Sequence, residues 1–446
     1  MAPGKLTAKA VGTEETLHLH RLYRGKVQTI AKCPLRGFDD FSIWYTPGIA
    51  EPCREIQRDP TLVYDYTNKG NTIAIVSDGT RVLGLGNIGP DAGLPVMEGK
   101  ALLFKFLGGV DAVPLCLRTH SADELVQAVK WTEPSFGAVN LEDIAHPTCF
   151  RVLDRLRREA AIPVWHDDQQ GTATVVLAAL LNALKVVDKR LENARIAMIG
   201  IGAANFATYR LLTAAGANRD QIVACDRCGT LHPGRRDIDE QRENLPEKWH
   251  ICQATNAQRR TGGIAEALRA ADVCLAFSSS GPGILRPEWI REMAPGAIVF
   301  ACANPIPEIW PQDAKEAGAR VVATGRGDFP NQVNNSLGFP AIFRGVLDVR
   351  ATTISDRMAL AAARELAAAA GELTPERIVP RMDEWEIYPR VAAATAMEAQ
   401  REGVAHLSRS RNELMETARR TISTARQATF ALMREGLIPA FPAEGC

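Results

Sequence analysis

Short apolar runs alternate with helix-like segments between about residues 70 and 350 of the chain. The runs at 73–76, 196–199 and 222–225 consist of small and branched apolar residues, a composition typical of strands that are buried on both faces. Strands that alternate with helices predict an α/β fold, in which helical crossovers join parallel strands.

The chain after residue 354 has a helical pattern only. An Ala-rich helix is expected to begin at Ser355, a residue suited to capping, and to stop at Gly371. A later helix is predicted by an apolar face that comprises Leu414, Ala418, Ile422, Ala425 and Leu432. We expect this helical tail to pack against the body of the protein or against a partner.

The strand expected at 196–199 leads into the sequence GIGAAN at 200–205, then a helix, then a second strand that ends in Asp226. This order matches the βαβ fingerprint of dinucleotide-binding domains. Gly200 permits the tight turn, and Gly202 lets backbone amides approach a pyrophosphate at the helix N-terminus. The residues expected to contact the cofactor here are Gly200, Gly202, Ala203, Ala204 and Asp226.

Asp226 stands at the spacing expected of the acid that accepts hydrogen bonds from the adenosine ribose. A carboxylate there favours NAD over NADP, because it would repel a 2′-phosphate. Arg227, Arg235 and Arg236 lie nearby and keep NADP possible. Asn205 replaces the small residue usual at its position, and we expect this substitution to widen the turn.

A second G-x-G-x-x-G sequence occupies residues 84–89, after the strand expected at 73–76. Pro90, Gly93 and Pro95 follow it directly, and they argue against a helix where a phosphate-binding fingerprint needs one. We therefore interpret this sequence as a loop of a substrate-binding domain.

Paired acids follow two further strands: Glu142 and Asp143 end one, and Asp167 and Asp168 end another. Either pair alone is explained equally well by acids at helix N-termini. Ligands of open α/β sheets bind at the carboxyl ends of strands, where converging carboxylates suit hard cations such as Mg²⁺ or Mn²⁺. We predict one shared cation site, beside which His166 has a structural or supporting role.

Composition narrows the classes of function. The chain of 446 residues has 52 basic and 52 acidic side chains and no basic run, which argues against nucleic acid or an anionic membrane as partner. No apolar run reaches spanning length, and the start Met1–Lys5 leads into polar residues with no apolar signal core. The scattered cysteines, including the pair Cys225 and Cys228, are expected to be reduced thiols. We expect a cytoplasmic protein that acts on a small molecule.

Seven separate motifs agree in type and order with one known family. They are YTPGIA at 45–50, DGTR at 78–81, PVMEGK at 95–100, LED at 141–143, DDQQGT at 167–172, ANP at 303–305 and NQVNN at 331–335. Over about residues 40–350 the chain therefore resembles the bacterial-type malic enzymes, which decarboxylate malate oxidatively. Ile306 departs from the family, whose members usually have threonine there.

The resemblance implies a role for each matching residue. The residues that resemble ligands of the divalent cation are Glu142, Asp143 and Asp168. Those that resemble the general base and the general acid are Lys100 and Tyr45. Those that resemble substrate-binding residues are Arg81, Asn304 and Asn334, of which Asn304 is also expected to contact the cofactor. Supporting positions are Asp167 and Asn335.

Lys100 follows Gly99 and opens the apolar run 101–104. This pattern predicts that Lys100 lies in the first turn of a helix, where the helix dipole and partial burial would lower its pKa. A lowered pKa suits a base that takes the hydroxyl proton of malate near neutral pH. Tyr45, whose phenol is normally protonated, would protonate the enolate, and a nearby Lys100 could resupply the proton.

These residues favour NAD-linked oxidative decarboxylation of L-malate to pyruvate and CO₂. Three alternatives stay open. A malolactic enzyme would keep its NAD bound and release lactate, and a related enzyme would act on another hydroxy diacid such as tartrate. A non-catalytic NAD-binding regulator is the third, although such a protein should have lost at least one catalytic side chain.

We predict three units in the chain. Residues 1–163 form an N-terminal α/β substrate and dimerisation domain, 164–353 a Rossmann-type NAD-binding domain with a parallel sheet, and 354–446 a C-terminal helical segment that packs back on the body. The active site is expected in the cleft between the first two. The resemblance implies a homodimer or higher homo-oligomer, and we hypothesise that a neighbouring subunit completes the site around Tyr45 and Lys100.

Overall fold

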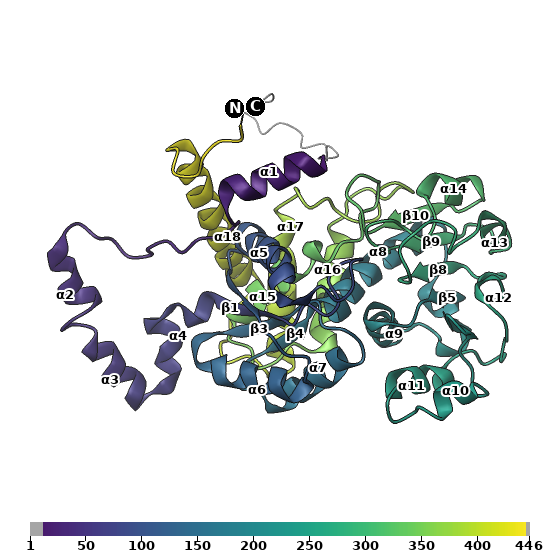
Figure 1. The fold of residues 1–446 in the computed structure, drawn as a ribbon, viewed down its shortest axis with the longest axis horizontal. Coiled ribbons are helices and arrows are strands. Elements are labelled where there is room, and N and C mark those ends of the chain that lie inside the picture. Colours follow the sequence, from purple (N-terminus) through teal and green to yellow (C-terminus); the bar gives the residue numbers. More distant parts are fainter. Residues whose placement is uncertain (1–11, 443–446) are drawn as a thin grey trace.

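The computed structural model describes residues 12–442 and contains two sheets with helices on both faces (Figure 1). The first sheet has the order β2-β1-β3-β4, all parallel, and its strands are β1 (Thr72–Ser77), β2 (Asp111–Cys116), β3 (Ala138–Leu141) and β4 (Val164–His166). The second has the order β10-β9-β8-β5-β6-β7, and its strands are β5 (Ile196–Ile199), β6 (Ile222–Asp226), β7 (Gly229–Thr230), β8 (Val273–Ala276), β9 (Ile298–Ala301) and β10 (Val321–Thr324). Only β7 is antiparallel to its neighbour. The predicted α/β class is confirmed.

Among the described residues, helices lie between successive parallel strands of each sheet, as expected of crossovers, and further helices precede β1 and follow β10. Their bounds are α1 (Thr13–Tyr23), α2 (Phe41–Trp44), α3 (Ala50–Arg58), α4 (Val63–Tyr66), α5 (Gly89–Gly108), α6 (Ala122–Thr132), α7 (Thr148–Glu159), α8 (Thr172–Val186), α9 (Ala203–Ala215), α10 (Arg236–Asp239), α11 (Pro246–Ala254), α12 (Ile264–Leu268), α13 (Pro287–Arg291), α14 (Pro311–Glu316), α15 (Phe339–Asp348), α16 (Asp356–Ala368), α17 (Ile387–Arg401) and α18 (Arg411–Arg434). None of these helices is both long and apolar enough to cross a membrane.

Each central strand is buried on both faces. In β1, Ile73 and Ile75 join the core that contains α5, α8 and α15, whereas Ala74 and Val76 join the core formed with α6 and α7. Successive side chains of a strand point to opposite faces, so one apolar run supplies both cores. This burial explains why the strands contain no polar alternation.

The C-terminal helices pack between and behind the two sheets (Figure 1). Ser355 caps α16 by accepting a hydrogen bond from the Met358 amide, as its sequence predicts. In α18, Leu414 and Ile422 are buried on the expected apolar face. The helical end of the chain is therefore confirmed, and α18 contacts α5 and α17.

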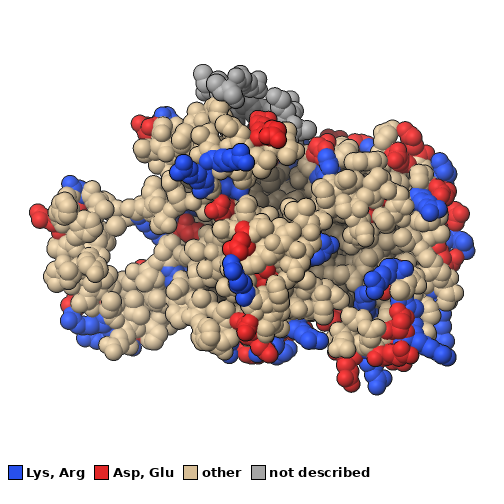
Figure 2. Space-filling model, in the orientation of Figure 1, with Lys and Arg blue, Asp and Glu red and all other residues tan. Residues whose placement is uncertain are grey.

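An arm that carries α2, α3 and α4 projects from the body between α1 and β1 (Figure 1). None of these three helices has a buried residue. Phe38 is 91% exposed and Tyr45 67% exposed, and most of the arm surface in view is uncharged (Figure 2). Large apolar side chains that stay in water mark a surface suited to a partner.

One local expectation needs revision. Helix α5 begins at Gly89, the last residue of the second glycine motif, so the prediction that no helix follows this motif is wrong. Pro90 fits the first turn because its missing N–H would have no partner there, and Pro95 removes only one hydrogen bond from a long helix.

Strand β4 pairs with β3, so the first sheet extends beyond residue 163. The three domain ranges remain predictions, and Met1–Lys5 lie outside the described residues.

Candidate active site

Three carboxylates converge at the carboxyl ends of β3 and β4. Glu142, Asp143 and Asp168 each present an oxygen within 4.8 Å of the others. The amide of Asp143 also donates to Asp168 Oδ2 at 2.9 Å, which ties the two strand ends together. Because β3 and β4 are adjacent and parallel, both acid pairs emerge at the same edge of the sheet.

The electrostatics of this cluster favour a bound cation. Burial and the charge of Asp168 raise the pKa of Asp143 to about 8. Burial also raises the pKa of Glu142 well above its usual range, although Lys100 opposes this. Asp143 Oδ2 has no hydrogen-bond partner among the described residues. Buried acids of like charge are costly unless something compensates them, so the donor set fits a divalent cation.

Lys100 is buried beside the acids. Its Nζ lies 2.6 Å from Asp167 Oδ2 and 2.9 Å from Glu142 Oε1, and 4.3 Å from the centre of the Phe339 ring. Burial alone would lower the pKa of Lys100, but the charges of Asp167 and Glu142 outweigh it, so the pKa is raised.

The expectation of a first-turn position and a lowered pKa for Lys100 is therefore wrong. Lys100 stands in the second half of α5, far along the helix from its N-terminus. The sequence shows the local helix pattern, whereas the carboxylates that hold the ammonium come from the residue after β3 and from the turn after β4.

A π turn, η5 (Asp167–Gly171), joins β4 to α8 and carries two of the acids. Trp165 Nε1 donates to Asp167 Oδ1 at 3.2 Å, and the same oxygen would lie 1.8 Å from a Cβ at position 171. Gly171 is therefore required for Asp167 to lie in the turn. π turns are often found at functional sites.

His166 is completely buried next to this turn. Neither ring nitrogen has a hydrogen-bond partner among the described residues, and Nδ1 lies 3.8 Å from Asp168 Oδ2. Burial lowers the pKa of His166 to about 4, so the ring is neutral at pH 7. The supporting role expected for His166 stays a prediction.

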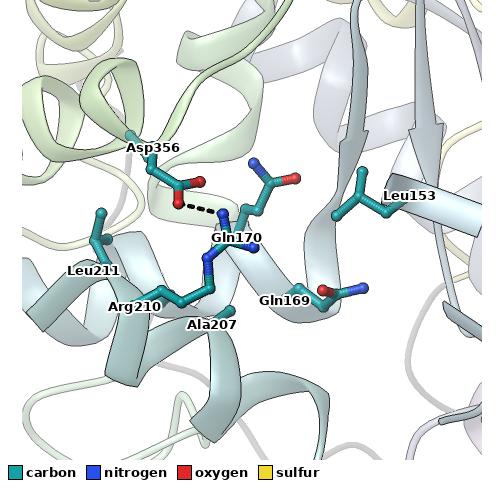
Figure 3. Close-up of a pocket in the computed structure, with 9 residues that line it drawn as sticks. Leu153, Gln169, Gln170, Ala207, Arg210, Leu211 and Asp356 are labelled. Carbon is teal, nitrogen blue, oxygen red and sulfur yellow. Dashed lines mark hydrogen bonds and ion pairs between the residues drawn. The ribbon is translucent and has the colours of Figure 1, made fainter. Parts of the chain in front are cut away.

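A small cavity lies behind the π turn (Figure 3). Gln169 and Gln170 line it from the turn, and Arg210 of α9 reaches across to Asp356 of α16 at 2.6 Å. Asp356 also contacts Arg157 of α7 at 3.3 Å. The turn is thus supported where the helices of both sheets meet.

Arg81 and Asn304 lie at the junction of the two sheets. The Arg81 amide donates to the Asp143 carbonyl oxygen at 3.0 Å, which holds the arginine at the edge of the carboxylate cluster. A Cβ at Gly84 would lie only 2.4 Å from the Asn304 carbonyl oxygen. The loop after β1 therefore packs directly against the loop after β9, and both side chains are exposed.

Asn334 and Asn335 begin the segment that leads into α15. The Asn334 side chain accepts a hydrogen bond from the Ser336 amide at 3.0 Å and so starts a short helical turn. Both asparagines are half-buried. Neither side chain forms a hydrogen bond with the carboxylate cluster among the described residues, so their substrate roles stay predictions.

The turn between β5 and α9 has the geometry of a phosphate cradle. Gly200 has φ +82°, and a Cβ there would lie 2.7 Å from the Phe277 carbonyl oxygen. Gly202 faces open space, and no side chain caps the N-terminus of α9, which includes Ala203 and Ala204. The free amides and the open space fit the pyrophosphate of a dinucleotide.

Asn205 does not widen this turn, so that expectation is wrong. It is fully buried, and its side-chain amide donates to the carbonyl oxygens of Ile199, Gly200 and Leu275 at 2.8–3.2 Å. These bonds connect the turn to β8 and hold it closed.

Asp226 ends β6, as expected, but its carboxylate already has partners. Arg235 contacts it at 3.1 Å and Lys248 at 3.2 Å, and Arg235 is itself held by Asp237. A ribose would therefore meet a carboxylate whose charge is largely balanced by two cations.

Tyr45 is the one predicted catalytic residue that the structure sets apart from the others. It ends α2 on the projecting arm, well away from α5 and the two sheets (Figure 1). Its neighbours are residues of the arm itself, such as Phe41, whose carbonyl oxygen accepts a bond from the Tyr45 amide. Within one chain, Lys100 is therefore not close enough to resupply its proton.

Comparison with known proteins agrees with this geometry. The family models "Malic enzyme, N-terminal domain" and "Malic enzyme, NAD binding domain" match residues 24–157 and 169–400. The bifunctional malic/malolactic enzyme of Bacillus subtilis is 47% identical over 409 residues, which cover 91% of this chain and 98% of that protein. The chain belongs to the malic enzyme family.

Two further malic enzymes extend the comparison. The NAD-dependent malic enzyme of Geobacillus stearothermophilus is 49% identical over 85% of this chain and 78% of its own. The crystal structure of the Entamoeba histolytica malic enzyme is 46% identical and superimposes with a TM-score of 0.93 over 96% of this chain and 90% of that one. NADP-dependent malic enzymes are also among the relatives.

Three residues that support this malic enzyme site went unnoticed in the sequence. Asn140 Nδ2 donates to Glu142 Oε2 at 2.8 Å, Trp165 holds Asp167, and Phe339 lies beneath Lys100. Asn140 offered a signal, because a polar residue inside a buried strand needs a partner. Phe339 offered none, because it lies far from Lys100 in the chain.

Proposed function

We propose that this chain catalyses the divalent-metal-dependent oxidative decarboxylation of L-malate to pyruvate and CO₂, with reduction of NAD. One observation carries the proposal. Three converging carboxylates and the buried Lys100 lie at one edge of the first sheet. The loop after β1, next to them, packs against the loop after β9 in the dinucleotide-binding sheet.

Glu142, Asp143 and Asp168 are proposed to hold Mg²⁺ or Mn²⁺. A divalent cation held by these three acids would supply Lewis acidity to the bound substrate, and this would stabilise the negative charge that develops as CO₂ leaves. Burial of Glu142 and Asp143 and the unpartnered Asp143 Oδ2 support this assignment. Asn140 would keep one oxygen of Glu142 occupied and so orient the other.

Lys100 is proposed as the general base for the malate hydroxyl. Its ammonium form cannot accept a proton, so Lys100 must first release one. Asp167 Oδ2, 2.6 Å from Nζ, is placed to receive it, and burial raises the pKa of the Asp167 carboxyl. The neutral amine would then take the hydroxyl proton as hydride leaves C2.

Substrate orientation is assigned to Arg81, Asn304 and Asn334. Arg81 is proposed to bind a malate carboxylate, because its backbone is tied to Asp143 beside the cation cluster. Asn304 is proposed to contact both substrate and cofactor, since its loop belongs to the nucleotide sheet but packs against Gly84. Asn334 and Asn335 would close the site from the segment before α15.

We infer that a second copy of the chain supplies Tyr45. The tyrosine is exposed on an arm with no core of its own, whereas the rest of the proposed site lies in the body. An arm of this kind docks on a symmetric partner at little cost, because both copies gain the same contact. The enzyme would therefore be at least a homodimer, with Tyr45 of one subunit protonating the enolate held by the other.

NAD is the proposed principal cofactor, because Asp226 would accept hydrogen bonds from ribose hydroxyls. Arg235 and Lys248 reduce the repulsion that this carboxylate would exert on a 2′-phosphate. NADP is therefore proposed as a weaker alternative substrate.

A malolactic reaction is the second candidate, because one similar relative is named as a bifunctional malic/malolactic enzyme. That reaction would use the same residues and return the hydride to pyruvate. Oxidation of another hydroxy diacid such as tartrate would also use them. A non-catalytic role is disfavoured because all five proposed catalytic and cation-binding side chains are present.

The deciding experiment follows absorbance of reduced nicotinamide with L-malate, Mn²⁺ and either NAD or NADP, and assays pyruvate and lactate at the end. NADH and pyruvate that rise together, and stop with EDTA, are the expected result. Lactate without NADH would establish the malolactic reaction instead. No product from malate, with turnover of tartrate, would overturn the proposed substrate.

A further inference from the structure

The loops after β8 and β9 are joined by one buried carboxylate. Glu308 is completely buried, and its Oε1 accepts hydrogen bonds from the Ser278 amide at 2.8 Å and the Ser278 hydroxyl at 3.1 Å. Its Oε2 accepts from the Ala303 amide at 3.0 Å. Glu308 itself stands after β9, so this side chain reaches back to the start of its own loop and across to the neighbouring one.

Backbone contacts extend the same connection. The Gly281 amide donates to the Ile306 carbonyl oxygen at 3.2 Å, and the Ser280 hydroxyl lies 3.1 Å from both the amide and the carbonyl oxygen of Ile306. Glu308 is therefore the innermost of several links between the two loops.

Each loop borders a different part of the proposed site. A Cβ at Gly200, in the turn between β5 and α9, would lie 2.9 Å from Ser278 Cα. The loop that contains Ser278 therefore packs directly against this turn. Ala303 precedes Asn304, whose carbonyl oxygen packs against Gly84 of the substrate sheet. A shift of one loop relative to the other would change the position of the cofactor relative to the substrate.

Burial of the Glu308 carboxylate between the two loops carries a desolvation cost. Among residues 12–442, the groups that act on the Glu308 carboxylate are Ser278, Ala303 and its own backbone, with no lysine or arginine. A buried carboxylate without a cation is costly. The negative charge is instead distributed over N–H and O–H donors that point to one spot. Fixed donors around one acceptor impose a narrow geometry, which a neutral side chain would not reproduce.

We propose that Glu308 is a positioning residue, which sets the Ser278 loop against the Asn304 loop and thereby the distance between bound dinucleotide and bound malate. The proposal rests on the proposed function, because Asn304 is expected to contact the substrate. Glu308 itself touches neither ligand and acts through Ser278 and Ala303.

The test compares Glu308→Gln with Glu398→Gln, a matched control on α17 whose carboxylate is also buried but pairs with Arg401 at 2.9 Å. Four quantities are measured for each variant: the dissociation constant for NADH by fluorescence titration without malate, kcat for malate, KM for malate, and the thermal midpoint. In Glu308→Gln the amide NH₂ would face an N–H donor, so the NADH dissociation constant and the malate KM should each rise about tenfold. Glu398→Gln should change the thermal midpoint alone.

A Glu308→Gln protein that loses stability but keeps both constants within about twofold of wild type would overturn the proposal, because the role would be structural only. If Glu308→Gln does not fold, Glu308→Asp replaces it. Aspartate keeps the charge but is one methylene shorter, so it cannot reach both loops, and the NADH dissociation constant should still rise about threefold. Unchanged NADH binding in Glu308→Asp would equally overturn the proposed positioning role of Glu308.

A wild-type chain that binds NADH but does not turn over malate would overturn the proposed function, and the NADH titration would still decide the role of Glu308.

Discussion

Gly171 has no room for a side chain, because a Cβ there would lie 1.8 Å from Asp167 Oδ1. Asp167 begins the π turn that Gly171 ends, and its other carboxylate oxygen, Oδ2, lies 2.6 Å from Lys100 Nζ. The smallest substitution at this glycine must therefore displace a buried acid of the proposed active site.

Gly171→Ala should lower kcat at least tenfold and destabilise the protein by about 1–3 kcal/mol, the usual cost of overpacking a core. The reason is that Asp167 must leave either Trp165 or Lys100. Steady-state kinetics and urea unfolding measure both effects. Gly263→Ala is the control, since nothing lies within 4 Å of its Cβ and its φ is −94°. Wild-type kinetics in Gly171→Ala would show that the position of Asp167 does not matter.

The carboxylate cluster predicts that Mn²⁺ or Mg²⁺ stabilises the folded protein. A cation at a hundred times its dissociation constant should add about 2.7 kcal/mol, because it relieves the repulsion among buried acids. The thermal midpoint should rise by several degrees and return to its starting value with EDTA. Asp168→Asn should lose this response, whereas Asp154→Asn, on α7, should keep it. A midpoint that does not respond to either cation would contradict the cation site.

Because Tyr45 lies on the arm, we expect that two inactive variants can restore each other's activity when they form a hybrid dimer. Tyr45→Phe and Asp168→Asn subunits should form hybrids in which one site has both residues intact, so an equal mixture should reach about a quarter of wild-type activity. A mixture of Lys100→Met and Asp168→Asn should stay inactive, because both residues belong to one body. Co-expression with two affinity tags isolates the hybrids. Inactive Tyr45→Phe/Asp168→Asn hybrids would place Tyr45 in its own chain's site.

The partners of Asp226 predict how the cofactor preference can be changed. Lys248→Ala leaves the carboxylate with Arg235 alone, so repulsion of a 2′-phosphate should grow and the KM for NADP should rise about tenfold. The KM for NAD should change far less. Initial rates with each cofactor measure the ratio, and Arg242→Ala, an exposed arginine nearby, is the control. An unchanged ratio would show that Lys248 does not face the 2′ position.

We expect the contribution of Asp272 to the free energy of unfolding to be lost at acidic pH. Burial would raise its pKa, but hydrogen bonds from Arg195 and Lys189 outweigh burial, and the pKa is lowered. The stabilisation is therefore fully present above the unfolded pKa of about 3.9 and is lost as the pH falls through the lower pKa of the folded protein. Asp272→Asn should cost about 1–3 kcal/mol at pH 7, since a charged acceptor is lost.

Urea unfolding of both proteins from pH 7 downward measures this difference. The two free energies of unfolding should converge only as the pH falls below about 4. A difference that is independent of pH over this range would show that the charge of Asp272 contributes nothing.

Local patterns predicted the elements of this fold well because they depend on neighbours in the chain. The run at 196–199 is β5 as expected, and Ser355 caps α16 through a bond to Met358, three residues away. The acids after β3 and β4 were also expected to meet, because parallel strands bring their carboxyl ends to one edge of a sheet. The second glycine motif misled us, since the cost of Pro90 and Pro95 is small where a helix is otherwise well packed.

The sequence by itself therefore determined the α/β class, the nucleotide turn and the set of acids that form the carboxylate cluster, because spacing along the chain controls each of them. Only the tertiary structure decided the ionisation of Lys100, the partners of Asp226, the inward position of Asn205 and the separation of Tyr45 from the other proposed catalytic residues. These properties depend on charges, donors and surfaces that distant segments bring together, and such contacts leave no periodic trace in the chain.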